Sequence, residues 1–123
     1  RKVRIIIKDI IYININAKMY VKKEQLMKIV TICGSFKFQK EMLEIGEKLS
    51  LEGCCVLHPI YPVNTKLVLT EEQIGLLKEG HLKRIEISDA IFVCNIDGYV
   101  GESTKKEIEY AKKLNKEIMY YDE

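Results

Sequence analysis

Glu107 is the residue of this sequence whose type and placement best suit covalent chemistry. It lies in the segment 101–111 (GESTKKEIEYA), whose apolar periodicity predicts a helix. Positions i, i+3, i+4 and i+7 of that helix are Glu107, Tyr110, Ala111 and Leu114, which places the carboxylate on the inward-packing face. A carboxylate held there is a candidate nucleophile or general base.

The same carboxylate also fits a purely structural role. Thr104-x-x-Glu107 has the spacing of a capping box, in which the glutamate only accepts a hydrogen bond from a backbone amide at the start of a helix. The spacing alone leaves both roles of Glu107 open.

A second candidate site is Gly34-Ser35-Phe36-Lys37, which joins a predicted strand to a predicted helix. Glycine permits close backbone approach, and free amides at a helix start favour an anion such as phosphate, to which Lys37 would add positive charge. The segment is neither GxGxxG nor a P-loop, so it carries no dinucleotide or ATP motif. An ordinary strand-to-helix turn explains the segment equally well.

These segments are positioned by strands and helices that alternate from Met27 onward. Short apolar runs predict strands at 28–33, 54–57, 89–95 and 117–121, and helical periodicity predicts helices at 36–51, 70–88 and 104–114. Thr70 and Gln73 have capping-box spacing at the start of the middle helix. Because the strands are almost wholly apolar, we predict an α/β fold with an open, doubly wound, mostly parallel sheet of the flavodoxin-like type.

In such a sheet, ligands bind beyond the carboxyl ends of the strands, where the strand order reverses. The segments 34–37 and 97–107 both follow strands at that edge. The residues predicted to contact a ligand near Glu107 are Gly34, Ser35, Phe36, Lys37, Asp97, Gly101 and Ser103.

Composition bounds the class of protein. The chain has 123 residues, of which 47% are hydrophobic and 31% charged, which suits one globular core and excludes disorder. The apolar runs are far too short to span a membrane, so no membrane partner is expected. The net charge of +2 divides into +5 for residues 1–26 and −3 for the remainder, which argues against nucleic-acid binding by residues 27–123.

Residues 1–26 form a basic leader rich in Ile and Lys. It lacks the cleavage site of a signal peptide. One hypothesis is that translation naturally starts at Met27 and that the leader is translated upstream DNA, because Lys23-Glu24 can be encoded by a ribosome-binding sequence. The alternative is a real strand, from about Val3 to Ile15, that adds to a sheet edge.

The four cysteines, Cys33, Cys54, Cys55 and Cys94, all fall in or beside predicted strands and have no metal-ligand spacing. We therefore predict small core residues in a reducing compartment, with a cytoplasmic location and no metal.

Taken together, the motifs resemble the nucleoside 2-deoxyribosyltransferase family and the related 2′-deoxynucleoside 5′-monophosphate N-glycosidases. The matching segments are KIVTICGSF at 28–36, DAIFVCN at 89–95 and GESTKKEIEYA at 101–111, the last being similar to the family's Gly-Thr-x-x-Glu-Ile-Gly-x-Ala signature. The resemblance extends over nearly all of residues 27–123.

The resemblance implies a function and roles for single residues. Glu107 matches the nucleophile that attacks C1′ of the deoxyribose. Gly34, Ser35 and the 101–103 loop match positions that hold the sugar or a 5′-phosphate. The expected partner is a nucleoside or nucleotide, no cofactor is required, and a homo-oligomer that shares its active sites is expected.

Three positions depart from the family pattern. His81 stands where relatives place an acid that assists the departing base, and it could transfer a proton or simply pack within the helix. Gly101 replaces a polar residue, for which Ser103 or Glu102 could compensate, and Glu109 replaces a glycine. These departures leave a second hypothesis, a catalytically silent nucleotide-binding module. A flavodoxin or phospho-receiver is a third, which the missing acidic cluster and phosphate cradle disfavour.

Overall fold

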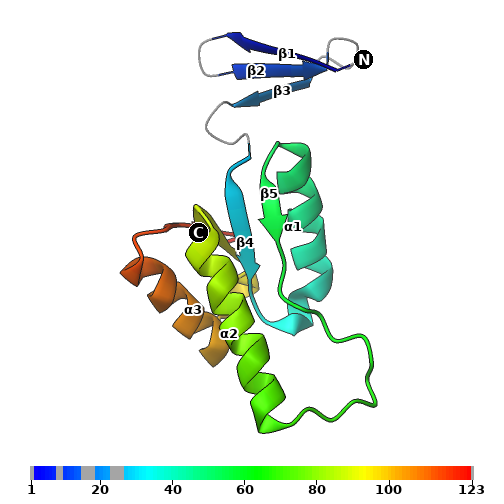
Figure 1. Ribbon diagram of the computed structural model, residues 1–123, viewed down its shortest axis with the longest axis vertical. Coiled ribbons are helices and arrows are strands. Elements are labelled where there is room, and N and C mark those ends of the chain that lie inside the picture. The colour runs from blue at the N-terminus through cyan, green and yellow to red at the C-terminus, as the bar shows by residue number, and fades with distance from the viewer. Residues whose placement is uncertain (1, 8–9, 15–18, 23–26, 123) are drawn as a thin grey trace.

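The computed structural model describes residues 2–7, 10–14, 19–22 and 27–122. From residue 27 the elements are β4 (Ile29–Cys33), α1 (Gln39–Leu51), β5 (Cys55–Leu57), α2 (Glu71–Ile87), β6 (Ala90–Val93), α3 (Glu102–Lys113) and β7 (Glu117–Tyr120). The 3-10 turns η2 (Phe36–Phe38) and η3 (Ile96–Gly98) follow β4 and β6. This is the predicted alternation of strands and helices (Figure 1).

The sheet built by β4 to β7 is entirely parallel, with the spatial order β5-β4-β6-β7. Chain order and spatial order reverse between β4 and β6, which are direct neighbours paired from Val30 with Ala90 to Cys33 with Val93. The predicted doubly wound, parallel α/β fold is therefore confirmed, and its switch point lies at the carboxyl ends of β4 and β6.

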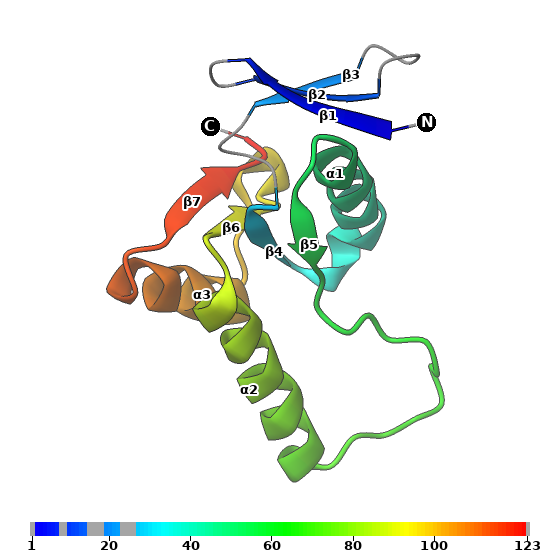
Figure 2. The ribbon, with the colours of Figure 1, turned by 45° about the horizontal axis from the view of Figure 1, so that its top comes forward.

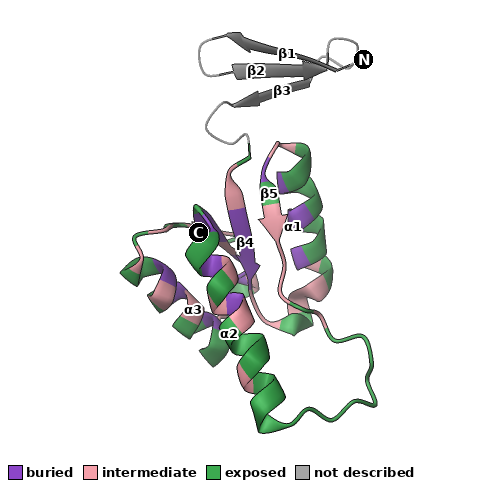
Figure 3. Ribbon diagram, viewed as in Figure 1, coloured by how far each residue is buried: buried purple, intermediate pink, exposed green. Residues whose placement is uncertain are grey.

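Helices cover both faces of this sheet and create two apolar layers, as Figure 2 shows. On one face, α1 packs its Met42, Ile45 and Leu49 against Val30 and Ile32 of β4. On the other face, α2 and α3 pack over Cys33 and the strand β6; the buried residues of this layer are Cys33, Ile85, Ile91, Val93, Ile108 and Ala111. The central strand β4 is consequently buried over almost its whole length (Figure 3).

The cysteines follow this layering. Cys33, Cys54 and Cys94 are buried, as predicted for small core residues. Cys55 is exposed, and for it the prediction is wrong. It opens β5, which is an edge strand of the sheet and packs against α1.

The helix starts differ in how well the sequence predicts them. At α2 the predicted capping box is present, because the Thr70 hydroxyl accepts from the Gln73 amide at 3.1 Å and the Gln73 side chain accepts from the Thr70 amide at 3.0 Å. At α3 the capping box left open by the spacing of Thr104 and Glu107 is absent, because the helix already begins at Glu102 with Gly101 as its N-cap. Thr104 is therefore a buried residue inside the first turn.

The helices α1 and α3 are amphipathic. In α1 the buried positions Met42, Ile45, Gly46 and Leu49 follow the i, i+3, i+4, i+7 pattern. No helix among the described residues is long and apolar enough to cross a membrane.

The leader contributes three strands: β1 (Lys2–Ile7), β2 (Ile10–Asn14) and β3 (Met19–Lys22). They form an antiparallel sheet of their own in the order β1-β2-β3, and the described strands of the two sheets are not paired with each other. Residues 8, 9 and 15 of the strand predicted over 3–15 lie outside the described residues. Natural translation from Met27 stays a prediction.

A glycine in α1 admits the ring of His58, which follows β5. A Cβ on Gly46 would lie 2.3 Å from His58 Nε2, and the other ring nitrogen of His58 is 2.9 Å from the Tyr61 hydroxyl. Gly46→Ala therefore displaces His58 and breaks this hydrogen bond, and we expect a net loss of about 1 kcal/mol in the free energy of unfolding.

Gly75→Ala in α2 is the matched control, because no atom lies within 4 Å of a Cβ at that position. Alanine has the higher helix propensity, so this variant should gain about 0.5–1 kcal/mol. Urea unfolding measures both changes, and equal effects of the two substitutions would contradict the packing of His58 into Gly46.

Candidate functional site

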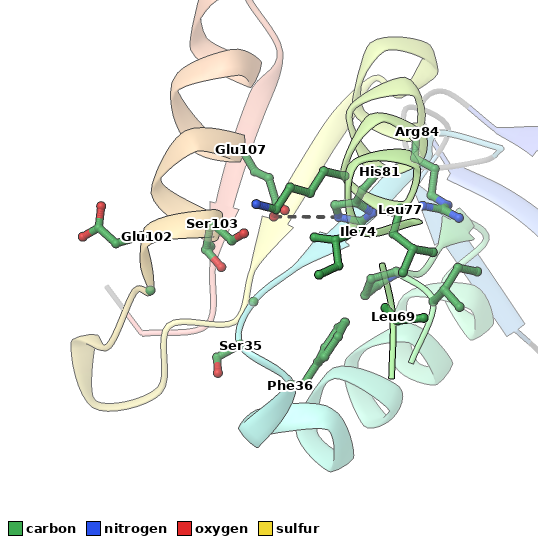
Figure 4. A pocket seen from close by; sticks show the side chains of 16 residues that line it. Ser35, Phe36, Leu69, Ile74, Leu77, His81, Arg84, Glu102, Ser103 and Glu107 are labelled. Carbon is green, nitrogen blue, oxygen red and sulfur yellow. Dashed lines mark hydrogen bonds and ion pairs between the residues drawn. The ribbon is translucent and has the colours of Figure 1, made fainter. Parts of the chain in front are cut away.

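A pocket of about 430 Å³ opens at the switch point of the sheet. This volume falls in the range of small-molecule sites. Its lining comes from the β4–η2 turn, the loop after β5, one side of α2 and the first turns of α3 (Figure 4); the lining residues are Gly34, Ser35, Phe36, Pro59, Ile60, Leu69, Ile74, Leu77, Lys78, His81, Arg84, Gly101, Glu102, Ser103, Thr104 and Glu107.

The pocket exists because α2 is longer than the strands it covers. Its 17 residues extend about 26 Å, whereas the five residues of β4 extend about 16 Å. The carboxyl-terminal half of α2 buries Ile85 against the sheet, while the amino-terminal half passes the carboxyl edge of the strands (Figure 1). Ile74 and Leu77 on that half are 40% and 42% exposed and form a wall of the pocket.

Glu107 lies on α3, more than one turn after the helix start. It cannot cap that start, so the structure removes the capping-box explanation and leaves the carboxyl group at the pocket. Only 18% of its side chain is exposed. Burial disfavours the charged form and raises the pKa of Glu107 to about 7, and a hydrogen bond from the Cys33 thiol opposes this rise in part.

His81 of α2 faces Glu107 across the pocket, with Nε2 at 3.8 Å from the carboxyl Oε1 (Figure 4). Burial and, next, the charge of Arg84 lower the pKa of His81 to about 4. Arg84 Nη1 lies 3.4 Å from Nδ1 of the ring. At neutral pH the imidazole is therefore neutral. Burial disfavours the charged form of both His81 and Glu107, so their contact is not a full ion pair.

Cys33 closes the same cluster from the end of β4. Its Sγ is 3.7 Å from His81 Nε2, and the side chain is wholly buried. Burial, followed by the nearby Glu107 carboxylate, raises the pKa of the thiol. Cys33, His81 and Glu107 have potential ligand atoms that all lie within 4.8 Å of one another, so these three residues could hold a metal ion.

The predicted Gly34-Ser35-Phe36 turn reaches the pocket directly. A Cβ on Gly34 would lie 3.1 Å from Cys94 Cβ and 3.2 Å from Met42 Sδ, so the turn is held tightly against the core. Ser35 is the N-cap of η2, and Phe36 is 46% exposed at the pocket floor. Of the α3 positions, Gly101 and Ser103 also line the pocket.

Lys37 and Asp97 lie outside the pocket lining. The Lys37 ammonium is 3.2 Å from the centroid of the Tyr99 ring, a cation–π contact. Asp97 has a positive φ of 55°, and its backbone amide donates to Asp122 Oδ2 at 2.7 Å. Sequence spacing brings both residues to the correct edge of the sheet, but their local turns direct them elsewhere.

Apart from His81, sequence reasoning missed the contribution of α2 and of the loop before it. Lys78 and Arg84 bring two cations to the lining, and Leu69, Ile74 and Leu77 bring apolar surface. The signal was present in the helical spacing of Ile74, Leu77 and His81, which places the three residues on one face of the helix. Comparing the length of the helix with that of the strands could have shown that its first turns extend past the sheet.

Asp89 lies at the opposite edge of the sheet. Its Oδ2 accepts from the Ile29 amide at 2.8 Å, and its own amide donates to the Ile29 carbonyl at 2.8 Å. These contacts join the starts of β4 and β6, a structural role and not a chemical one.

No protein-family model and no curated protein matches the chain. Among solved structures, the fold is similar to that of a 2-desoxiribosyltransferase from Leishmania mexicana, with a TM-score of 0.57 at 16% sequence identity. The match covers 76% of this chain and 63% of that chain, so the present chain spans less than two thirds of that protein. At this identity the likeness shows the fold alone.

The two buried groups give opposite pH dependences of stability. The folded protein keeps a proton on Glu107 that the unfolded chain has lost, so the free energy of unfolding falls as pH rises from 4.5 to about 7. Buried His81 stays neutral where the unfolded chain takes up a proton, so the free energy of unfolding rises as pH rises from about 4 to 6.5.

We therefore expect the two contributions to cancel in the wild type. From acidic to neutral pH, the free energy of unfolding of Glu107→Gln should rise by about 3 kcal/mol relative to that of the wild type. That of His81→Gln should fall by a similar amount relative to the wild type over the same range. Urea unfolding across this pH range measures the differences. Parallel profiles for the three proteins would show that neither group is buried as described.

Proposed function

We propose that this chain cleaves or transfers the N-glycosidic bond of a 2′-deoxynucleoside or its 5′-monophosphate. The observation that carries the proposal is the buried Glu107 carboxyl group, free of any capping role, at the wall of a pocket on the switch point. The fold likeness to a 2-desoxiribosyltransferase and the sequence resemblance around residues 28–36 and 101–111 support the same reaction class.

In the proposed reaction, a carboxylate oxygen of Glu107 forms a bond to C1′ as the bond from C1′ to the base nitrogen breaks. The departing base takes the electron pair and a proton from solvent water, and the sugar remains as an ester of deoxyribose on Glu107. Water or a second base then attacks C1′ and releases the carboxylate. If water attacks, the deoxyribose is freed; if a base attacks, a new nucleoside forms.

His81 is a poor proton donor to the departing base at neutral pH. With a pKa of about 4, only about one His81 side chain in a thousand carries the extra proton at neutral pH. A role of His81 as imidazolium donor is thus confined to acidic solution. At neutral pH its proposed role is to hold the Glu107 side chain in position through the 3.8 Å contact.

The proposed substrate contacts come from the two predicted turns. Gly34, Ser35 and Phe36 would face the sugar and base from one side, and Gly101 and Ser103 from the other. Lys78 and Arg84 supply positive charge at the same pocket, which suits a 5′-phosphate. The proposal needs no organic cofactor.

We also propose a homo-oligomer that covers the outer wall of this pocket. The loop before α2 and the first turns of that helix expose apolar side chains that include Val63 at 92%, Val68 at 88% and Leu76 at 60%. Exposed apolar side chains that gather on one segment are typical of an interface. A second copy would complete the pocket beside Ile74 and Leu77.

The reaction is tested with the full chain and a panel of deoxynucleosides and their 5′-monophosphates, with free base followed by chromatography. We expect base release or exchange, and a loss of at least roughly 1,000-fold in Glu107→Ala. Glu109→Ala is the matched control, because Glu109 is exposed on the same helix and should retain activity. Since the nucleophile must be ionised, kcat/KM should rise with pH through about 7.

Two results would contradict this proposal. Equal rates for Glu107→Ala and Glu109→Ala would remove Glu107 as the nucleophile. A folded chain that is stabilised by a nucleotide in thermal unfolding but releases no base would instead support the alternative, a catalytically silent nucleotide-binding module.

The oligomer is tested by measuring the mass in solution. We expect the wild type to exceed the 14.3 kDa of one chain, and the double variant Val68→Lys, Leu76→Lys to return to it. Leu51→Lys is the control, because Leu51 is 65% exposed at the far end of α1 and away from the pocket. A wild-type mass of one chain would end the oligomer proposal.

A further inference from the structure

We propose that Cys33, His81 and Glu107 form a binding site for a divalent transition-metal ion of the zinc class, open to the pocket. The sequence spacing predicts no metal site, because the three residues are 48 and 26 positions apart along the chain. The fold brings them together from three elements, β4, α2 and α3.

Two of the three pairs of potential ligand atoms have nearly the spacing that a tetrahedral ion requires. His81 Nε2 lies 3.7 Å from Cys33 Sγ and 3.8 Å from Glu107 Oε1, so one nitrogen faces both partners. Around tetrahedral zinc, bond lengths of about 2.0–2.3 Å place neighbouring ligand atoms roughly 3.4–3.6 Å apart. The third pair, the Cys33 sulfur and a Glu107 carboxylate oxygen, lies within 4.8 Å, so side-chain shifts of up to about 1 Å would complete the site.

The donor set selects the class of ion. A thiolate, an imidazole and a carboxylate suit zinc and its neighbours in the first transition series. Calcium and magnesium prefer oxygen ligands alone and are disfavoured. Three protein ligands leave a fourth position, which would face the pocket because His81 and Glu107 line it.

Arg84 opposes metal binding in the observed arrangement. Its Nη1 lies 3.4 Å from His81 Nδ1, and a guanidinium can only donate, so this contact keeps the imidazole proton on Nε2. To bind a metal through Nε2, the ring must carry its proton on Nδ1 and Arg84 must turn away. Arg84 is partly exposed and has a long side chain that can adopt other rotamers. The position of its guanidinium group therefore changes the affinity of the site for the metal ion.

Binding also releases protons. The Cys33 thiol gives its proton to solvent and coordinates as thiolate, the Glu107 carboxyl group coordinates in its ionised form, and His81 coordinates as neutral imidazole. The negative charges of the thiolate and the carboxylate together balance the two positive charges of the bound ion. No oxidant or reductant takes part.

Metal binding has a consequence that rests on the proposed function. An ion held by Glu107 withdraws electron density from the carboxylate that would attack C1′ and occupies the space beside it, so metal binding opposes glycosyl transfer. Zinc would then act as an inhibitor that competes with substrate. The binding site itself does not depend on the reaction.

The site is tested by titrating cobalt(II), as a spectroscopic substitute for zinc, into the reduced full chain. We expect one ion per chain, thiolate-to-cobalt charge-transfer absorption, visible bands of a four-coordinate ion, and displacement by zinc. Cys33→Ser should abolish the charge-transfer absorption, and Glu107→Gln should weaken binding at least about 10-fold. Cys55→Ser is the control, because that thiol is exposed and outside the cluster.

A variant that improves binding guards against a loss that reflects misfolding. Arg84→Met removes the donor at Nδ1, and we expect it to tighten cobalt binding by about 10-fold. The proposal is overturned if the folded wild type shows no charge-transfer absorption, if Cys33→Ser retains it, or if Cys55→Ser abolishes it. Cobalt binding without any base release supports the site and removes only its inhibitory role, and base release without cobalt binding overturns the site alone.

Discussion

The difference in length between α2 and the sheet is the constraint on which the pocket depends. A helix as short as the strands would end at the carboxyl edge and leave the switch point open to solvent. Because α2 continues past that edge, its own side chains wall off a volume above β4 and place His81 at the boundary between core and pocket. The same helix therefore performs two tasks, and its apolar stripe changes from core to pocket lining along its length.

The cluster at that boundary shows a conflict between stability and chemistry. Three groups that prefer different surroundings, a thiol, an imidazole and a carboxyl, share a space from which water is largely excluded. Each lowers the cost of burial by staying neutral, which is why the pKa of Glu107 is raised and that of His81 lowered. A nucleophile must give up that neutrality, and functional sites commonly accept such a cost.

Much of the fold could be predicted because it depends on local signals. Residues 29–32 of the buried strand β4 are all β-branched, and the start of α2 has a complete capping box, so local patterns were sufficient to predict both. The start of α3 was mispredicted because Gly101 serves as its N-cap without a side-chain hydrogen bond, so the sequence carries no capping signal at the true boundary.

The candidate site was only partly predictable, for a geometrical reason. Glu107 could be placed from helical spacing alone, whereas its contact with Cys33 depends on how far α2 and α3 stand above β4. Lys37 has the position in the chain that a ligand contact would need, but its ammonium group lies over the ring of Tyr99 and does not line the pocket. Such outcomes follow from side-chain packing between distant segments, which no local pattern encodes.

The loop between β5 and α2 has a consequence for how this pocket can change in evolution. The loop is held at one end by the hydrogen bond between His58 and Tyr61 and at the other by the Thr70 cap (Figure 2). Between these ends, the hydrogen bonds that residues 62–69 make with other described residues are all accepted by Asn64, within the loop itself. Insertions between the two tethers cost little chain entropy and leave both ends in register. Ligand range can therefore diversify through loop length and composition, while the sheet and the buried cluster remain unchanged.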